Sequence, residues 1–134
     1  MSNTVFHRCR NVFLAAILIA TTGTTAMATD PAAGKPVTLI NVFEIPEGQL
    51  DQTIAFWEKA RNFLKKQPGF LDTSLHQSLS PDARFQLVNV ARWQSPAAFQ
   101  AAIEKMQKSD LGGGMRGAVF HAALYRVIRT EEDR

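Results

Sequence analysis

The chain has 134 residues, 15 of them basic and 12 acidic, which gives a formal net charge of +3. Two of the basic residues, Arg8 and Arg10, belong to an N-terminal segment that we interpret as a leader, which leaves 13 basic residues against 12 acidic ones, a net charge of +1. Without the leader the domain is nearly neutral, so it lacks the basic surface of nucleic-acid-binding proteins. Because Cys9 is the only cysteine and lies in the same segment, the remainder excludes disulfides, thiolate metal sites and cysteine nucleophiles.

The first 28 residues have the pattern of a Sec-type signal peptide. The two arginines precede an apolar run from Val12 to Ala20 that is too short to span a bilayer, and Ala26-Met27-Ala28 fits an A-x-A cleavage site. We therefore predict cleavage after Ala28 and a periplasmic or secreted protein without stable membrane contact. The predicted divisions are a leader over 1–28, a linker over 29–36, one domain over 37–129 and a polar tail over 130–134.

Residues 37–45 are rich in β-branched and aromatic side chains and predict a first strand, with Leu39, Asn41 and Phe43 on one face. After a turn at residues 46–48, helical spacing predicts a helix that Pro68-Gly69 ends. The stripe at this spacing consists of Leu50, Ile54, Trp57, Arg61 and Leu64. The basic group on the same helix is interpreted as a solvated face and consists of Lys59, Arg61, Lys65 and Lys66.

Residues 70–78 predict a second strand, residues 80–82 a turn and residues 85–93 a third strand. On the third strand Asn89 and Trp93 share a face and stand roughly 13 Å apart, at about 3.3 Å per residue. Ser95-Pro96 is an N-cap and first-turn pair that begins a second helix, which residues 112–114 are expected to end. Residues 119–128 predict a fourth strand.

The order β-α-β-β-α-β predicts an α+β fold of the ferredoxin-like type, in which two helices cover one side of an antiparallel sheet. The other side of the sheet is also apolar, because Val88 and Val90 point away from the face of Asn89. In water this side would form a larger apolar patch than soluble monomers usually tolerate. We therefore predict a homodimer through the sheet face.

From about Val37 to Ile128 the chain resembles the antibiotic biosynthesis monooxygenase (ABM) family, through residues 40–43, 68–70, 89–95 with Phe99, and 123–125. The resemblance implies a dimeric α+β barrel built from two ferredoxin-like protomers. It also implies a cofactor-independent monooxygenase that acts with O2 on a small aromatic or quinone-like substrate. The alternative left open is a non-catalytic periplasmic protein that binds a hydrophobic ligand, because one fold serves many functions.

In the quinone-forming branch of that family an Asn and a Trp line the pocket, and they map onto Asn89 and Trp93. That branch has a tyrosine six residues after the Trp, where this chain has Phe99, which carries no hydroxyl. A second amide, Asn41, points the same way as Leu39 and Phe43 and gives an apolar pocket two groups that could orient a phenolate. We predict Asn89, Trp93 and Asn41 as catalytic residues and Phe99, Phe43, Arg116 and His76 as substrate contacts.

The heme-degrading branch supplies the alternative cofactor. Its catalytic Asn in the first strand matches Asn41, but the Trp that distorts the porphyrin would fall at Ala102, and its axial His has no counterpart in residues 108–118. Heme would then require His76 or His121, both in predicted strands, as the axial ligand. We therefore expect no cofactor and no metal, with heme as the alternative.

Gly112 to Gly117 formally fits the dinucleotide-binding pattern G-x-G-x-x-G. It follows a helix and leads into a strand, which is the reverse of the context that phosphate binding requires. We interpret this segment as a loop beside the pocket, from which Arg116 could meet an anionic substituent.

Overall fold

The computed structural model describes residues 34–131, so the predicted leader, most of the linker and the last three residues of the tail lie outside it. The elements are β1 (Val37–Glu44), α1 (Leu50–Leu64), β2 (Phe70–Gln77), β3 (Leu87–Trp93), α2 (Pro96–Gln107) and β4 (Val119–Tyr125). Their order confirms the predicted β-α-β-β-α-β arrangement. Within residues 34–131 no helix has the length and apolar character needed to cross a membrane.

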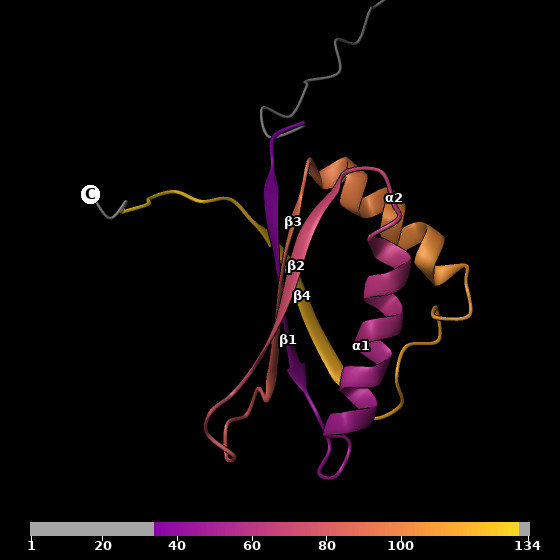
Figure 1. The fold of residues 1–134 in the computed structure, drawn as a ribbon, viewed down its shortest axis with the longest axis vertical. Helices are drawn as coiled ribbons and strands as arrows, with labels where there is room; N and C mark the ends of the chain where they lie inside the picture. The colour runs from indigo at the N-terminus through magenta and orange to yellow at the C-terminus, as the bar shows by residue number, and fades with distance from the viewer. Residues whose placement is uncertain (1–33, 132–134) are drawn as a thin grey trace, which may run out of the picture.

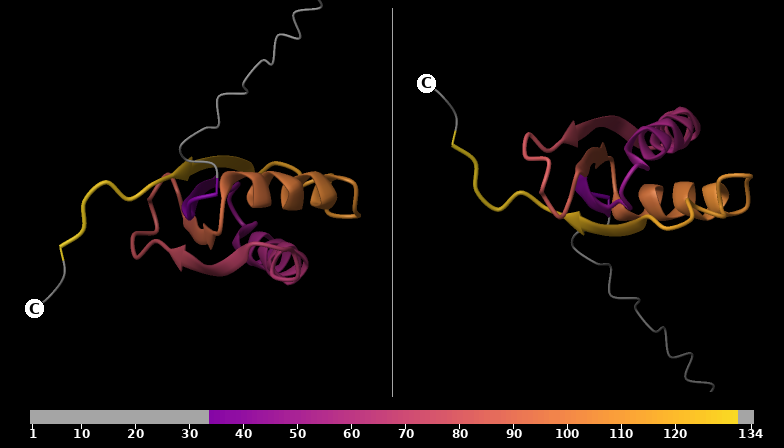
Figure 2. Two further views of the ribbon diagram at one scale, coloured as in Figure 1. Left: turned by 90° about the horizontal axis from the view of Figure 1, so that it is seen from above. Right: turned by 90° about the horizontal axis from the view of Figure 1, so that it is seen from below.

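The four strands form one antiparallel sheet in the order β2-β3-β1-β4, and both helices lie on the same side of it (Figure 1). Each helix connects two strands that are not neighbours, because β3 lies between β1 and β2, and β1 lies between β3 and β4. Viewed along the strands, α1 lies toward the β2 edge and α2 toward the β4 edge (Figure 2). This is the predicted ferredoxin-like fold, and we refer to the uncovered side as the open face.

The start of α2 is as predicted, but its end is not. Ser95 is extended and its Oγ accepts a hydrogen bond of 3.1 Å from the backbone N–H of Ala98, with Pro96 as the first helical residue. The helix ends at Gln107, before the glycines that we expected to end it. A β-carbon at Gly112 would lie 2.0 Å from the Gln107 carbonyl oxygen, so this glycine lets the following loop fold back against the helix end.

β4 is shorter than predicted. It ends at Tyr125, which pairs with Thr38 near the start of β1, whereas we expected the strand to reach Ile128. Its only neighbour in the sheet, β1, begins at Val37 after Pro36, and proline has no N–H to continue the ladder. The residues that follow β4 therefore have no strand to pair with, and Ile128 is 75% exposed.

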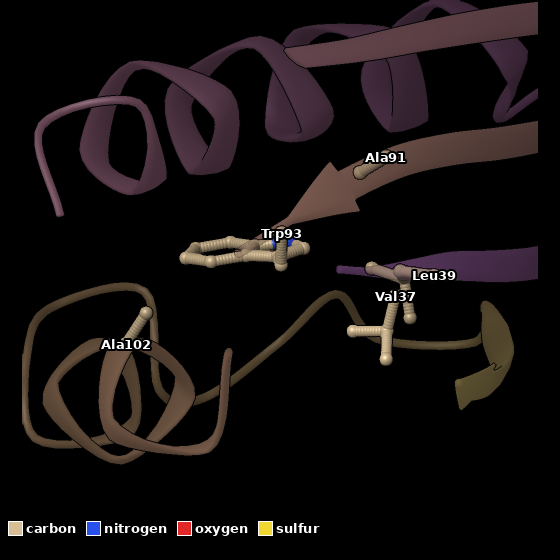
Figure 3. Packing of buried hydrophobic residues seen from close by; sticks show 5 residues of the cluster. All are labelled: Val37, Leu39, Ala91, Trp93 and Ala102. Carbon is tan, nitrogen blue, oxygen red and sulfur yellow. The ribbon is translucent and has the colours of Figure 1, made fainter. Parts of the chain in front are cut away.

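The core lies where the end of β3 meets α2. Trp93 is 1% exposed, and its indole lies between β3 and α2, with Ala102 of α2 directed toward it (Figure 3). The rings of Phe70 and Phe99 meet it edge to face, with centroids 5.4 and 5.6 Å from that of Trp93. Such contacts favour one ring orientation over others, so Trp93 is held in place.

The open face carries an apolar strip between charged groups that are paired. The strip consists of Ile40, Val42, Val88 and Val90, all half-buried. On either side of it, Arg92 pairs with Asp72, while Arg84 and His121 both bond Glu44 at 2.8 and 2.9 Å. Arg84 holds the pKa of Glu44 below its ordinary value, and Arg92 does the same to the pKa of Asp72. The face therefore offers apolar surface without an unpaired carboxylate near it.

We propose that a second copy of the sheet covers this strip, in an interface of about 800 Å² per partner. Val90→Asp would bury a charge without a partner, which costs several kcal/mol. We expect this variant to dissociate or unfold in sedimentation experiments, while Leu79→Asp, at a fully exposed site, keeps the wild-type mass. A wild-type monomer, or a folded Val90→Asp protein of unchanged mass, would contradict the proposal.

Candidate functional site

A cavity of about 410 Å³ lies between the covered face of the sheet and the two helices. Its size falls in the range of about 300–1,000 Å³ typical of small-molecule sites. Most of its lining is aliphatic or aromatic. The polar side chains that reach it are Asn41, Trp57, Arg61, Asn89 and Gln107. The cavity therefore suits an apolar molecule that carries few polar groups.

Five of the seven residues predicted for the site line this one cavity. They are Asn41, Phe43, Asn89, Trp93 and Phe99. Alternation correctly places the four strand residues on the side of the sheet that the helices cover, while Phe99 reaches the cavity from α2. Their roles in binding or catalysis stay predictions.

The side-chain amide of Asn89 is held in one orientation. Its Oδ1 accepts a hydrogen bond of 3.0 Å from Nε1 of Trp57 on α1 and one of 2.6 Å from Oγ1 of Thr73 on β2. Because an indole N–H can only donate, the atom that faces it must be the amide oxygen. The NH2 group has no protein partner among residues 34–131, so it is the part of Asn89 left to bind a ligand in the cavity.

Asn41 faces Asn89 directly across the β1–β3 pairing. Its Oδ1 is buried and has no hydrogen-bond partner among residues 34–131. On its other side β1 pairs Asn41 with Ala122, whose small side chain leaves room above the sheet. Since no partner fixes the Asn41 amide, rotation of this group can present the cavity with either its donor or its acceptor. The pair therefore combines one locked amide with one adjustable amide.

Trp93 and Phe99 form a wall of the cavity. Trp93 is almost fully buried and two rings pack edge to face against it, so it offers a ligand little open ring surface. Its Nε1 is also buried and bonds no other residue in the part of the chain that the structure describes. Phe99 is half-buried and lines the cavity next to it, which confirms that the pocket has a phenyl ring and no hydroxyl at this position.

The structure does not bring the other two predicted contacts, Arg116 and His76, to the cavity. His76 lies on the open face, where its Nδ1 is 3.3 Å from the carbonyl oxygen of Val88. Arg116 is exposed and is not part of the lining, although Gly112 and Gly114 of the same loop are. The loop thus lies beside the pocket as predicted, but its backbone, and not its arginine, approaches the ligand space.

Three residues that matter for the site were not identified from the sequence. In the sequence analysis Trp57 is only a member of the helical stripe. A buried indole N–H usually needs a hydrogen-bond acceptor, and this requirement could have pointed to its bond with Asn89. Thr73 shares the face of Asn89 on the neighbouring strand. Our interpretation of the basic group of α1 as a solvated face is wrong for Arg61, which is half-buried and lines the cavity, whereas Lys59 is exposed.

The cavity contains one ionisable side chain. Among the described residues that line it, Arg61 is the only one that carries a charge, and none is an aspartate, a glutamate or a histidine. The lining therefore holds hydrogen-bond donors and a cation but no general base. Within residues 34–131, no group of three or more His, Cys, Asp and Glu side chains is placed to hold a metal ion.

Comparison with known proteins shows which family the chain matches. The model of the family described as antibiotic biosynthesis monooxygenase matches residues 36–105. A protein from Shewanella loihica PV-4, proposed to be a monooxygenase, is 50% identical in sequence, with a TM-score of 0.67 over 72% of this chain and 97% of that one. No curated protein is similar enough to count as a match.

Two more distant structures share the fold. SnoaB, a cofactor-independent oxygenase from Streptomyces nogalater, is 22% identical, with a TM-score of 0.63 over 74% of this chain and 99% of that one. A variant of MhuD with two manganese protoporphyrin IX molecules bound per active site is also 22% identical, with a TM-score of 0.55 over 72% and 99% of the two chains. At this identity both likenesses concern the fold alone.

The lock on Asn89 can be tested through stability. Thr73→Val keeps the shape of the side chain but removes the hydroxyl that donates to Asn89, and we expect the free energy of unfolding to fall by about 1 kcal/mol. Urea denaturation measures this change. Thr38→Val is the matched control, because Thr38 lies on the open face and forms no side-chain hydrogen bond with a described residue. Equal losses of stability in the two variants would show that the hydrogen bond from Thr73 to Asn89 does not stabilise the protein.

Proposed function

Because the chain belongs to the antibiotic biosynthesis monooxygenase family, we propose that it is an oxygenase that uses molecular oxygen on a small, electron-rich aromatic substrate without metal or flavin. The fold that it shares with the cofactor-independent oxygenase SnoaB supports this proposal. The observation that carries it is the pair of amides, Asn89 and Asn41, placed opposite each other in an apolar cavity.

The two amides are suited to hold a phenol or enol oxygen. The NH2 of Asn89 is already directed to the cavity before a ligand binds, so no reorganisation is needed when charge develops on that oxygen. Asn41 can accept a hydrogen bond from the neutral hydroxyl and, after rotation of its amide, donate one to the ionised oxygen. Together they stabilise the substrate anion, which is the form that reacts with oxygen.

The proposed reaction needs no other reductant. The ionised aromatic transfers an electron to O2, a C–O bond forms to give a hydroperoxide, and loss of water leaves a carbonyl. A ring CH2 and O2 thereby become C=O and H2O, so the substrate supplies all four electrons. One oxygen atom enters the product and the other leaves as water. The apolar walls, including Phe99 and Trp93, keep bulk water away from the anion.

The absence of acids and histidines from the described lining supports a particular route for loss of the substrate proton. Without a general base, the proton leaves to solvent, and the cavity acts by favouring the anion. Desolvation in an apolar cavity raises the pKa of a phenol or enol, while donors and a nearby cation lower it. In the proposal the amides of Asn89 and Asn41 outweigh the desolvation.

The placement of the histidines supports a reaction without heme, although MhuD binds a porphyrin. His76 and His121 both lie on the open face, where His121 bonds Glu44 and His76 faces Val88. Neither lines the cavity, so neither fits the role of an axial ligand in it. We derive no step through heme.

We propose that the enzyme is exported, on the basis of the leader pattern in residues 1–28, which lie outside the described residues. A purely storing role is not favoured, because an apolar ligand alone does not require an amide locked toward the cavity by two hydrogen bonds.

Substitution of Asn89 tests the mechanism. Loss of one pre-oriented oxyanion donor typically lowers kcat by about 10²–10³-fold, so we expect this loss in oxygen uptake with dithranol, an anthrone, for Asn89→Ala. Asn41→Ala should cause a smaller decrease, since its amide is not held in place. His76→Ala is the control, because His76 lies on the other face. Oxygen uptake that all three variants retain at the wild-type rate would exclude the amide pair from the mechanism.

The pH dependence tests the absence of a base. We expect kcat/KM to rise with pH through an inflection that belongs to the substrate, because the lining has no titrating acid or histidine. Two anthrones whose pKa values differ by about one unit should therefore give inflections that differ by about one unit. A single inflection shared by both substrates would reveal a base on the protein and contradict this part of the proposal.

A further inference from the structure

Arg61 is a cation without a counterion in the wall of the cavity. It is half-buried, and no carboxylate among residues 34–131 forms an ion pair with it. Its only hydrogen bond to a described side chain is a long one of 3.4 Å from its Nη2 to Oδ1 of the neighbouring Asn62. Most of the donor capacity of the guanidinium is therefore free.

The position of Arg61 is nevertheless defined. It follows Trp57 by one turn of α1, and its guanidinium carbon lies over the indole at 5.1 Å from the ring centroid. A guanidinium partly removed from water loses hydration, and stacking on an indole compensates for only part of that loss. An anion in the cavity would supply the missing partner.

Trp57 connects this cation to the amide pair. Its ring supports Arg61, and its Nε1 bonds the oxygen of Asn89. A flat molecule that lies against Trp57 thus meets amide donors at one end and a guanidinium at the other. Of the polar side chains that line the described cavity, only Arg61 carries a full charge.

We propose that Arg61 binds a carboxylate on the substrate, so that the enzyme acts on aromatic acids whose ionisable hydroxyl lies at the amide pair. The placement of the reacting hydroxyl at the amide pair rests on the proposed oxygenase function, whereas carboxylate binding by Arg61 does not. A planar guanidinium matches a carboxylate with two parallel hydrogen bonds. A phosphate dianion fits less well, because the described lining offers no second cation to balance its charge.

Binding of two unreactive probes tests the inference directly. Anthracene-9-carboxylate and anthracene-9-carboxamide have nearly the same shape, and only the first is charged. Calorimetric titration of the purified protein should give about 10- to 100-fold tighter binding of the carboxylate, the range expected for a charge-assisted hydrogen bond. Arg61→Gln should abolish this preference and leave the affinity for the carboxamide unchanged, which also shows that the cavity is intact.

Lys59→Gln is the matched control, since it removes a charge from the same helix at an exposed position outside the lining. It should keep the wild-type preference for the carboxylate. Equal affinities of the wild type for the two probes would overturn the inference. So would an Arg61→Gln variant that loses both probes equally, or a Lys59→Gln variant that loses the preference as Arg61→Gln does.

The two proposals fail separately. The titrations involve no oxygen, so a preference for the carboxylate that depends on Arg61 stands even if no phenol is oxidised. Conversely, oxygen uptake with a neutral anthrone that depends on Asn89, together with equal affinities of the wild type for both probes, would support an oxygenase and exclude the acid site.

Discussion

The hydrogen bond between Trp57 Nε1 and Asn89 Oδ1 is the contact on which the site depends. It joins α1 to the middle of the sheet across the cavity, and it can exist in only one sense, since an indole N–H never accepts. From β2, the hydroxyl of Thr73 donates a second hydrogen bond to the same oxygen of Asn89 and so fixes the amide in the same orientation. A neutral amide thereby becomes a directed donor, which suits a cavity that we propose holds an apolar substrate and stabilises its anion.

The fold makes this contact available through two crossovers on the same side of the sheet. Pairing of β1 with β3 puts Asn41 opposite Asn89, while α1 lies above them and provides Trp57 and Arg61. The wall formed by Trp93 is rigid because aromatic rings pack against it from both β2 and α2. The residues of the proposed site thus lie on the covered side of the sheet, while the open face carries the ion pairs and the apolar strip that we propose a second copy covers.

The sequence predicts those features that repeat locally. Alternation along β1 and β3 is enough to place Asn41 and Asn89 on one face, and Ser95-Pro96 is enough to begin α2. It could not show which side chain of α1 reaches Asn89, because that depends on how far the helix is rotated and how high it stands above the sheet. For the same reason the sequence left two interpretations of Arg61 open, because it belongs both to the stripe of Trp57 and to a group of cations that we interpreted as a solvated face. His76 was misleading because alternation along β2 does not say which of its two faces the helices cover, and the register pairs His76 with Val88 on the open face.

The central claim is that Asn89 binds the substrate oxygen with an amide whose orientation is fixed before binding. A crystal structure of the protein with 1,8-dihydroxyanthraquinone, a molecule already oxidised and so inert to further reaction, tests it most directly. The account predicts a ligand oxygen within about 2.7–3.2 Å of Asn89 Nδ2, with the bond from Trp57 to Asn89 Oδ1 retained. A ligand bound outside the cavity, or an Asn89 whose bond to Trp57 has broken to admit it, would contradict the account.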